Sequence, residues 1–417
     1  MLARLLALIL LFVSSAGAQT LAIRAGNLID PATGKVSRNQ TILVKDGKIT
    51  AVGAGVEIPK DAHVVDLSNA WVMPGLMDAH AHLTAGPAPG IPFPVTTPYL
   101  SESTALRALR GLHNARAVLE AGFTAVKDVG NDAEWAAVDV RRAIEKGWFP
   151  GPTLLTTGKI IAPFGGQSQN VPPEQGAFWK YEYLDADTPD QVRQAVRRNI
   201  YYGANAIKLV ADHNAYFYSK EEVRAAIEEA HAAGMTVAVH VYGGQAATNV
   251  IQAGPDSVEH GFDLSDEQLR LMKEKGIFLV GTDFPEVHLK LMDFNPVVGG
   301  KTLGQRIVDR LRRAHQMGVK MAFGTDVFVE LPDKSRAELM LDYLDVWTAA
   351  GVSPADILKA MTTNAAELFR WQGKRGAIAA GQAADIIATP ANPLENIQTL
   401  RQVQFVMKDG TIIKQGK

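Results

Sequence analysis

Two patterns in this 417-residue sequence predict an α/β fold, a (β/α)8 or TIM barrel joined to a small β-sandwich. The first pattern is an alternation of eight short apolar runs with longer segments of helical apolar spacing, between about residues 72 and 376. The second is a pair of similar β-rich hairpins, one near each chain end. Eight such alternations suit a closed parallel barrel. A doubly wound open sheet is the alternative, but no glycine-rich phosphate loop follows the first run.

The first residues are typical of a secretory signal peptide. A short positive start at 1–4 precedes the apolar run Leu5–Val13 and the small residues Ala16-Gly17-Ala18. This order predicts cleavage after Ala18. An uncleaved membrane anchor is the alternative, but the run is too short to span a bilayer comfortably. We therefore expect a periplasmic or secreted protein with no membrane attachment once the signal is removed.

Composition narrows the classes of function. Hydrophobic residues make up 47% and charged residues 21% of the chain, as in ordinary globular proteins. The formal net charge is −2 and no basic run occurs, so nucleic acid is not an expected partner. The absence of cysteine excludes disulfides and thiolate metal sites. Any metal must therefore be bound by histidine, carboxylate or a less usual ligand.

The two hairpins predict a domain built from both chain ends. Thr41–Gly53 turns at Asp46-Gly47, and Phe405–Gly416 turns at Asp409-Gly410. An Asp-Gly pair tolerates the positive φ angles of a type I′ turn. Neither hairpin buries much surface alone, so we expect both in one sandwich. The expected division is a signal peptide at 1–18, a composite sandwich at 19–74 plus 377–417, and a barrel at 75–376.

The eight apolar runs are the expected barrel strands, and segments between them have helical spacing. The runs are Val72–Leu83, Ala125–Val129, Thr153–Ile161, Ala206–Ala211, Val237–Val241, Ser257–His260, Phe278–Gly281 and Met321–Gly324. Ser219–Ala233 and Ser265–Lys275 are predicted helices. Glycines stand near the expected helix ends, at Gly122, Gly234, Gly276 and Gly318.

Residues that could bind a metal lie at or near the ends of five of these runs. They are His80 and His82 on the first, Lys208 in the fourth, His240 on the fifth, His260 on the sixth and Asp326 after the eighth. The two histidines of the first run are two residues apart, so their side chains share one side of the strand. Because active sites of such barrels lie at the carboxyl ends of the strands, we expect all six residues at one rim.

These residues resemble the amidohydrolase superfamily, the metal-dependent hydrolases on a (β/α)8 barrel. The resemblance covers nearly the whole chain after the signal, and is carried by Pro74–His82, Gly324–Asp326 and the tail from Thr362 to Asp385. Gly122–Gly130 and His240–Gly243 are most similar to the imidazolonepropionase-related branch, which contains Xaa-Pro dipeptidases and ochratoxin-hydrolysing amidases. Lys127, where arginine is more usual, and the short segment between strands four and five are departures that bear on the substrate.

The resemblance implies a binuclear metal centre. His80 and His82 would bind the more buried metal, His240 and His260 the outer one, and Asp326 the inner metal. Lys208 would be carboxylated by CO2 and bridge both metals; a plain lysine would favour a mononuclear site or none. Apolar neighbours would lower the pKa of Lys208 and so favour the neutral amine that carbamate formation needs. Nitrogen and oxygen ligands suit Zn²⁺ first, then Mn²⁺, Co²⁺, Ni²⁺ or Fe²⁺.

The expected function is metal-assisted hydrolysis of an amide or peptide bond in a small substrate, dipeptidase- or amidase-like. A water bridging two metals would lose a proton to Asp326, attack as hydroxide, and the same carboxyl would protonate the departing amine. Tyr242 shares a side with His240 and could donate to the developing oxyanion, or could merely pack. Alternatives are a lactone, carbamate or phosphotriester hydrolase, and a non-catalytic metal- or ligand-binding barrel. A homo-oligomer is compatible with the sequence.

Several other residues have expected supporting or structural roles. Asp78 shares a face with His80 and could support it by a hydrogen bond. His213 and His288 are expected in loops at the rim, solvated or contacting substrate. Ala85–Pro98 is a candidate lid, and Phe164–Asn170 a candidate substrate loop. Four further histidines are expected to be structural: His63, His113, His231 and His315.

Overall fold

The computed structural model describes residues 20–86, 102–130, 133–168, 172–331 and 333–416. The signal peptide predicted at 1–18 lies outside the described residues. So do residues 87–98 of the candidate lid and residues 169 and 170 of the candidate substrate loop. Within the described ranges, no helix is both long enough and apolar enough to cross a membrane.

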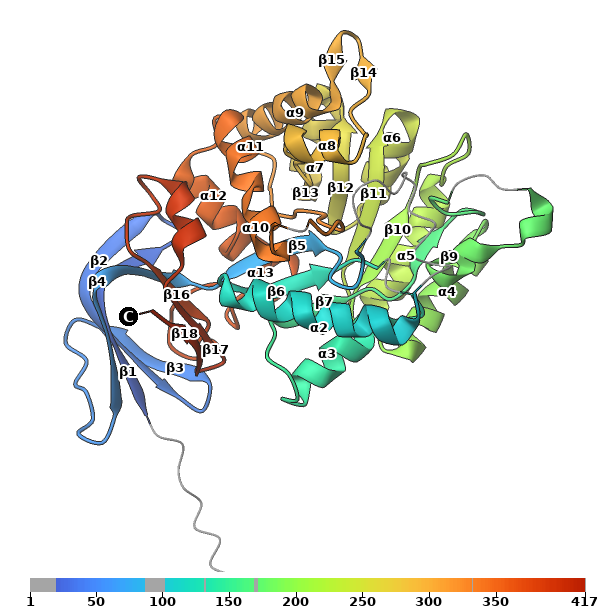
Figure 1. Cartoon of the computed structure of the whole chain (residues 1–417). Helices are drawn as coiled ribbons and strands as arrows, with labels where there is room; N and C mark the ends of the chain where they lie inside the picture. The colour runs from blue at the N-terminus through green and yellow to red at the C-terminus, as the bar shows by residue number, and fades with distance from the viewer. Residues whose placement is uncertain (1–19, 87–101, 131–132, 169–171, 332, 417) are drawn as a thin grey trace, which may run out of the picture.

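Strands from the two chain ends form one seven-stranded sheet (Figure 1). The N-terminal part supplies β1 (Leu21–Asp30), β2 (Lys35–Lys45), β3 (Lys48–Gly53) and β4 (His63–Pro74). The C-terminal part supplies β16 (Ile386–Thr389), β17 (Phe405–Lys408) and β18 (Thr411–Gln415). The order is β18-β17-β16-β4-β1-β2-β3, with β16 pairing antiparallel to β4. The prediction that both ends build one small β domain is confirmed.

Both predicted Asp-Gly turns have the expected backbone conformation. The φ angles are 50° and 76° at Asp46 and Gly47, and 46° and 75° at Asp409 and Gly410. The two turns also contact each other, because a Cβ atom added to Gly47 would lie 3.0 Å from the carbonyl oxygen of Asp409. The hairpins therefore meet at their tips around a shared apolar core, which includes side chains such as Ile42 of β2.

Parallel strands form the wall of the barrel. The first three are β5 (Leu76–Ala81), β6 (Phe123–Asp128) and β7 (Thr153–Thr156). The next four are β10 (Ile207–Val210), β11 (Val237–Gly243), β12 (Ser257–Asp263) and β13 (Phe278–Val280). Nearly all residues of these strands are buried, which explains why they form continuous apolar runs rather than alternating ones. Two short strands, β8 (Ile160–Ala162) and β9 (Tyr183–Asp185), extend the second sheet beyond β10.

The eighth predicted run, Met321–Gly324, closes the ring although it forms only a single β-bridge, with Leu279 of β13. The backbone N–H of Ala322 donates to the carbonyl oxygen of Leu279 over 3.1 Å. On the other side, the N–H of Ala79 in β5 donates to the carbonyl oxygen of Phe323 over 2.7 Å. The residues entering β10 similarly donate to the carbonyl of Thr156 at the end of β7. Backbone hydrogen bonds thus join all eight runs, and the predicted barrel is confirmed.

Helices cover the outside of the barrel (Figure 1). In chain order they are α2 (Thr104–Glu120), α3 (Ala136–Glu145), α4 (Pro189–Tyr202), α5 (Lys220–Ala232), α6 (Gly244–Ala253), α7 (Asp266–Lys275), α8 (Glu286–Leu291), α9 (Leu303–Met317), α10 (Arg336–Leu341), α11 (Tyr343–Ala349), α12 (Pro354–Ala360) and α13 (Thr363–Leu368). A two-residue-strand hairpin, β14 (Val297–Val298) and β15 (Lys301–Thr302), precedes α9. Ser219 and Ser265 form capping boxes that start α5 and α7, as the two predicted helices require.

Two of the predicted runs are wrong as single strands. The run Thr153–Ile161 divides into β7 and β8, because Gly158 takes a positive φ of 67° and turns the chain. The run Val72–Leu83 divides between two sheets, because β4 ends at Pro74 and β5 begins at Leu76. The backbone N–H of Gly75 donates to Asp385 at this junction. An apolar run can therefore continue through a turn that is itself buried.

Candidate metal centre

The predicted ligands lie together at the carboxyl ends of the barrel strands. His80 is in β5, Lys208 in β10, His240 in β11 and His260 in β12. His82 directly follows β5, and Asp326 lies two residues after the end of the eighth run. One potential ligand atom from each of His80, His260 and Asp326 lies within 4.8 Å of the other two. The structure thus places the core of a metal-binding cluster where the sequence predicts it.

The other two imidazoles join the same cluster. The Nε2 atom of His82 lies 2.9 Å from Oδ1 of Asp326. The ring centroids of His240 and His260 are 4.3 Å apart, and those of His80 and His260 are 5.1 Å apart. Four imidazoles and one carboxylate therefore form one connected cluster of neighbours.

Hydrogen bonds on the far side of two rings fix how they face the cluster. Nδ1 of His80 lies 2.5 Å from Oε2 of Glu259, and Nδ1 of His82 lies 2.7 Å from the carbonyl oxygen of Gly130. A carboxylate and a carbonyl only accept, so each Nδ1 carries the hydrogen. Each Nε2 therefore faces Asp326, 3.5 Å and 2.9 Å away, and is the ring atom available to a metal. Burial alone would lower the pKa of His82, but Asp326 raises it, so a bound metal would replace a proton on this Nε2. Metal-binding histidines are oriented in this way.

Two of the ligands have strained backbones. His260 has a φ angle of 65° and Asp326 one of 56°, in the left-handed region that residues other than glycine rarely adopt. The backbone N–H of Asp326 donates to the carbonyl oxygen of His80 over 2.6 Å, which holds it beside β5. Such strain costs about 1–3 kcal/mol per residue and concentrates at functional sites.

Lys208 is the least satisfied polar group of the centre. It is 2% exposed, and its Nζ atom has no hydrogen-bond partner in the described part of the chain. Burial lowers the pKa of Lys208 to about 8, against the opposing influence of Glu259 and Asp326. A buried amine without a partner is costly, so an additional group that binds or modifies it is expected. This observation fits the bridging position that the sequence assigns to Lys208.

The protonation states also suit a divalent metal. Burial lowers the pKa of His240 and of His260 well below the ordinary value, which leaves neutral imidazoles. Burial alone would raise the pKa of Asp326, but His80 and His82 lower it well below its ordinary value. Neutral imidazole and carboxylate are ligands for Zn²⁺ and similar ions. The residues present therefore fit divalent metal ions.

A buried carboxylate beneath the cluster was missed by the sequence analysis. Glu259 of β12 accepts from His80, receives a hydrogen bond from the hydroxyl of Ser257, and lies 3.9 Å from Nζ of Lys127 in β6. Burial by itself would raise the pKa of Glu259, but Lys127 and His80 lower it to about 2. The sequence signal for Glu259 was an acidic residue inside an otherwise apolar strand. That signal does not show that the carboxylate contacts His80.

Three residues line the rim beside His240: Tyr242, Gln167 of the predicted substrate loop, and Asp212, which was not predicted from the sequence. The rings of His240 and Tyr242 are 4.6 Å apart, and Tyr242 stacks on Phe262 at 5.4 Å. Burial raises the pKa of Tyr242, so its hydroxyl remains a hydrogen-bond donor. Asp212 Oδ1 lies 3.7 Å and Gln167 Nε2 3.5 Å from Nε2 of His240. These groups could meet a substrate bound at the outer side of the cluster.

The remaining sequence assignments have mixed outcomes. Asp78 does contact His80, but its carboxylate accepts the backbone N–H over 2.8 Å and so holds the strand rather than the ring. His213 is exposed in a loop, as expected. The loop prediction for His288 is wrong, because the chain forms α8 there and buries the ring, with Nε2 3.1 Å from Asp342. The four histidines expected to be structural lie in β4, α2, α5 and α9.

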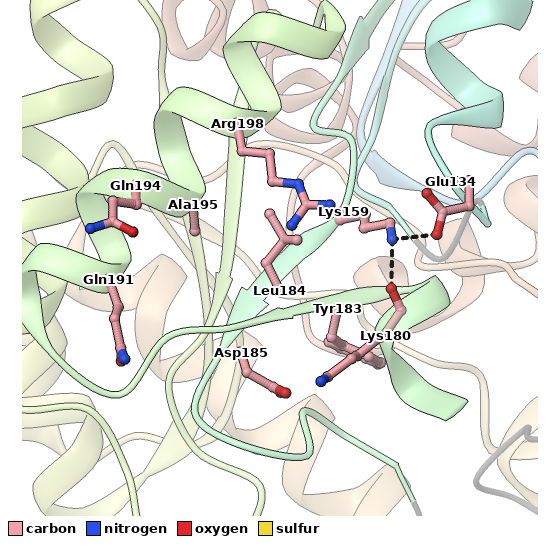
Figure 2. A pocket seen from close by; sticks show the side chains of 10 residues that line it. All are labelled: Glu134, Lys159, Lys180, Tyr183, Leu184, Asp185, Gln191, Gln194, Ala195 and Arg198. Carbon is pink, nitrogen blue, oxygen red and sulfur yellow. Dashed lines mark hydrogen bonds and ion pairs between the residues drawn. The ribbon is translucent and has the colours of Figure 1, made fainter. Parts of the chain in front are cut away.

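A separate cavity of about 540 Å³ lies between β9 and α4 (Figure 2). Its buried lysine, Lys159, donates to Glu134 over 2.6 Å and to the carbonyl oxygen of Lys180 over 2.5 Å. Tyr183 forms part of its lining and donates to Gln167 over 3.4 Å. None of the six predicted ligands is among the described residues that line this cavity, so it is distinct from the metal centre.

Comparisons with known proteins agree with this geometry. Residues 71–413 match the amidohydrolase family. The chain is 30% identical to ochratoxinase of Aspergillus niger, over 97% of this chain and 89% of that protein. Among solved structures, a Xaa-Pro dipeptidase with bound methionine is 29% identical with a TM-score of 0.80, over 95% of this chain and 100% of that one. A prolidase in complex with N-methylphosphonate-L-proline is 27% identical with a TM-score of 0.82, over the same shares. The chain therefore belongs to the amidohydrolase family, within the branch of these relatives, and is a hydrolase that acts on amide bonds.

Proposed function

We propose that this protein is a binuclear metal-dependent hydrolase that cleaves an amide or peptide bond in a small substrate, in the manner of a dipeptidase or amidase. The observation that carries the proposal is the cluster of four imidazoles and Asp326 at the barrel rim, together with the buried amine of Lys208, which has no hydrogen-bond partner among the described residues. The similarity to ochratoxinase and to a Xaa-Pro dipeptidase supports a substrate in which an amide nitrogen is the leaving group.

The chain offers ligands for two ions, Zn²⁺ first by its donor set. His80 and His82 with Asp326 would hold the inner ion, and His240 with His260 the outer ion. When bound, the two ions would lower the pKa of a water molecule and polarise the scissile carbonyl. All other contributions come from the side chains of this protein.

Lys208 would contribute as a carbamate that bridges the two ions. The neutral Nζ attacks CO2, an N–C bond forms and one amine proton leaves to solvent. With its pKa lowered to about 8, about one molecule in ten carries the neutral amine at pH 7. At the ordinary pKa the neutral share would be roughly one in a few thousand. Burial of Lys208 thus makes the modification far easier.

Asp326 and Tyr242 would manage the proton and the oxyanion. Asp326 accepts the proton of the attacking water on its carboxylate and delivers that proton to the nitrogen of the departing amine, which regenerates the carboxylate. Tyr242 keeps its proton and can donate a hydrogen bond to the carbonyl oxygen as negative charge develops there. Both side chains border His260: Asp326 Oδ2 lies 3.7 Å from its Nδ1, and the ring centroid of Tyr242 lies 5.8 Å from its own, which supports their action on one substrate group.

The test is turnover by the Zn²⁺-loaded protein on a dipeptide and N-acyl amino acid library, against panels of lactones, carbamates and phosphotriesters. We expect amide or peptide turnover, and a loss of about 10²–10⁴-fold in kcat for Asp326→Asn with most metal retained. Asp190→Asn, at an exposed carboxylate on α4, is the matched control and should keep full activity. Turnover confined to the other panels, or full activity of Asp326→Asn, would contradict the proposal.

A further inference from the structure

A line of buried polar groups runs beneath the metal cluster and crosses the barrel interior, from β12 to the neighbouring strands β5 and β6. Ser257 and Glu259 belong to β12, Lys127 to β6 and His80 to β5. All four residues are at most 1% exposed. The reaction proposed above uses only His80 of this set, so the other three side chains need a separate explanation.

The direction of the strand places Glu259 inside the barrel. Residues 257 and 259 are two apart in β12 and share one side of it, as the hydrogen bond from the Ser257 hydroxyl to the Glu259 carboxylate shows. Its other oxygen, Oε2, lies 2.5 Å from Nδ1 of His80. The neighbouring His260 has a positive φ and turns toward the rim. One short stretch of strand therefore contacts the cluster both from the rim and from below.

Packing alone does not explain a carboxylate at this position. Burying an ionised carboxylate costs several kcal/mol, and an apolar side chain of similar size in place of such a buried ion is often neutral or stabilising. Here the charge is accommodated because Lys127 lies 3.9 Å away and His80 and Ser257 donate hydrogen bonds to it, with a smaller electrostatic contribution from Lys208. Of the groups that contact the Glu259 carboxylate, only His80 is a ligand of the proposed metal centre. The buried carboxylate is therefore best explained as a hydrogen-bond acceptor for His80.

We propose that Glu259, with Lys127 as its counter-charge and Ser257 as a second donor, is a positioning residue that orients His80 for metal binding. Its carboxylate keeps the hydrogen of His80 on Nδ1 and the lone pair of Nε2 directed into the cluster. The inference rests on the proposed metal function and adds three residues to it. It also assigns a role to Lys127, at which the sequence departs from the expected arginine.

The experiment measures metal affinity rather than turnover. Purified wild type, Glu259→Leu and Glu259→Gln compete for Zn²⁺ with a chromophoric chelator, and absorption spectra of the Co²⁺-substituted proteins report ligand geometry. Glu259→Leu should weaken Zn²⁺ binding by about 10–100-fold and alter the Co²⁺ spectrum. Glu259→Gln should lose less, because its amide oxygen can still accept from His80. Glu182→Gln is the matched control, a fully buried carboxylate paired with Arg107 away from the ligands, and should bind Zn²⁺ like wild type.

Each outcome decides between the alternatives. Equal Zn²⁺ affinity and equal Co²⁺ spectra for wild type and Glu259→Leu would overturn the positioning role and leave the proposed function intact. A wild-type protein that binds no Zn²⁺ would overturn both. If Glu259→Leu does not fold, Glu259→Gln and Lys127→Met carry the test, and Lys127→Arg should retain the affinity that Lys127→Met loses. Unchanged affinity in both Glu259→Gln and Lys127→Met would then refute the inference.

Discussion

Replacing Lys208 by methionine is expected to stabilise the metal-free protein. The lysine is buried, and its Nζ makes no hydrogen bond within the described chain, so the substitution removes a charge without breaking a hydrogen bond. Glu259 and Asp326 attract the charged amine, but the desolvation of the amine outweighs this attraction. Methionine has a similar length and is apolar, which suits the surrounding strand residues. A functional residue whose removal stabilises the metal-free protein is expected where the site needs bound metal ions to compensate its buried charge.

The size and pH range of the effect follow from the pKa of Lys208. Burial lowers it from 10.5 to about 8, and at about 1.4 kcal/mol per pKa unit the charged amine costs on the order of 3 kcal/mol in the folded state. Since the folded pKa is below the unfolded one, the unfolded chain binds more protons between these values. Wild-type stability therefore rises as the pH increases from 8 to about 10.5. The advantage of the variant is greatest below pH 8 and shrinks across that window.

The assay is urea unfolding followed by tryptophan fluorescence, in EDTA and CO2-free buffer, at pH 7 and pH 9.5. Lys127→Met is the matched control, because Lys127 is equally buried but lies 3.9 Å from Glu259. That variant should be destabilised at pH 7, since it leaves a buried carboxylate without its cation. A Lys208→Met protein that is less stable than wild type at pH 7, or a gain that does not change with pH, would refute this reasoning.

Three further predictions concern the barrel and its rim. Gly324→Ala should lower the free energy of unfolding by about 1–3 kcal/mol and weaken Zn²⁺ binding, because the added Cβ would lie 2.9 Å from Cβ of His80. Urea unfolding measures the first effect and chelator competition the second. Gly55→Ala is the control and should change neither, because its Cβ meets nothing within 4 Å. Burial alone would raise the pKa of Asp342, but hydrogen bonds from His288, Lys334 and Arg401 lower it below the ordinary value. The ionised carboxylate therefore stabilises the fold above the ordinary carboxyl pKa of about 4, and this contribution is lost as the pH falls further. Asp342→Asn should therefore cost about 2 kcal/mol in urea unfolding at pH 7 and less at pH 3, whereas an equal cost at both pH values contradicts the charge assignment. Tyr242→Phe should lower kcat by about 10²–10³-fold with little change in KM, and an unchanged kcat would make Tyr242 a packing residue.

Local patterns predicted much of the fold because the forces behind them are local. The Asp-Gly turns required positive φ angles, and both adopt them. The apolar periodicity and the glycines that follow the helices placed α5 and α7 within a residue of their observed ends. The rim position of the predicted ligands followed from one rule of barrel geometry, that strand carboxyl ends emerge together. Each of these features depends either on residues close in sequence or on a general property of the barrel fold, so each can be predicted without knowing which distant residues meet.

The remaining features depend on contacts between distant residues. Glu259 and His80 are 179 positions apart, and no local pattern shows that β12 turns this carboxylate toward β5. The break at Gly158 was hidden because the turn there is buried, so hydrophobicity does not change along the run. His288 was predicted to lie in a loop, since the six residues of α8 are too few to show a helical period.

The most direct test of the account is an anomalous-scattering map from crystals of the Zn²⁺-loaded protein, recorded at the zinc absorption edge. The account predicts two peaks at the rim, one beside His80 and His82 and one beside His240 and His260. Extra density should extend from Nζ of Lys208 between them. A single peak, or no peak within reach of these side chains, would contradict the binuclear centre.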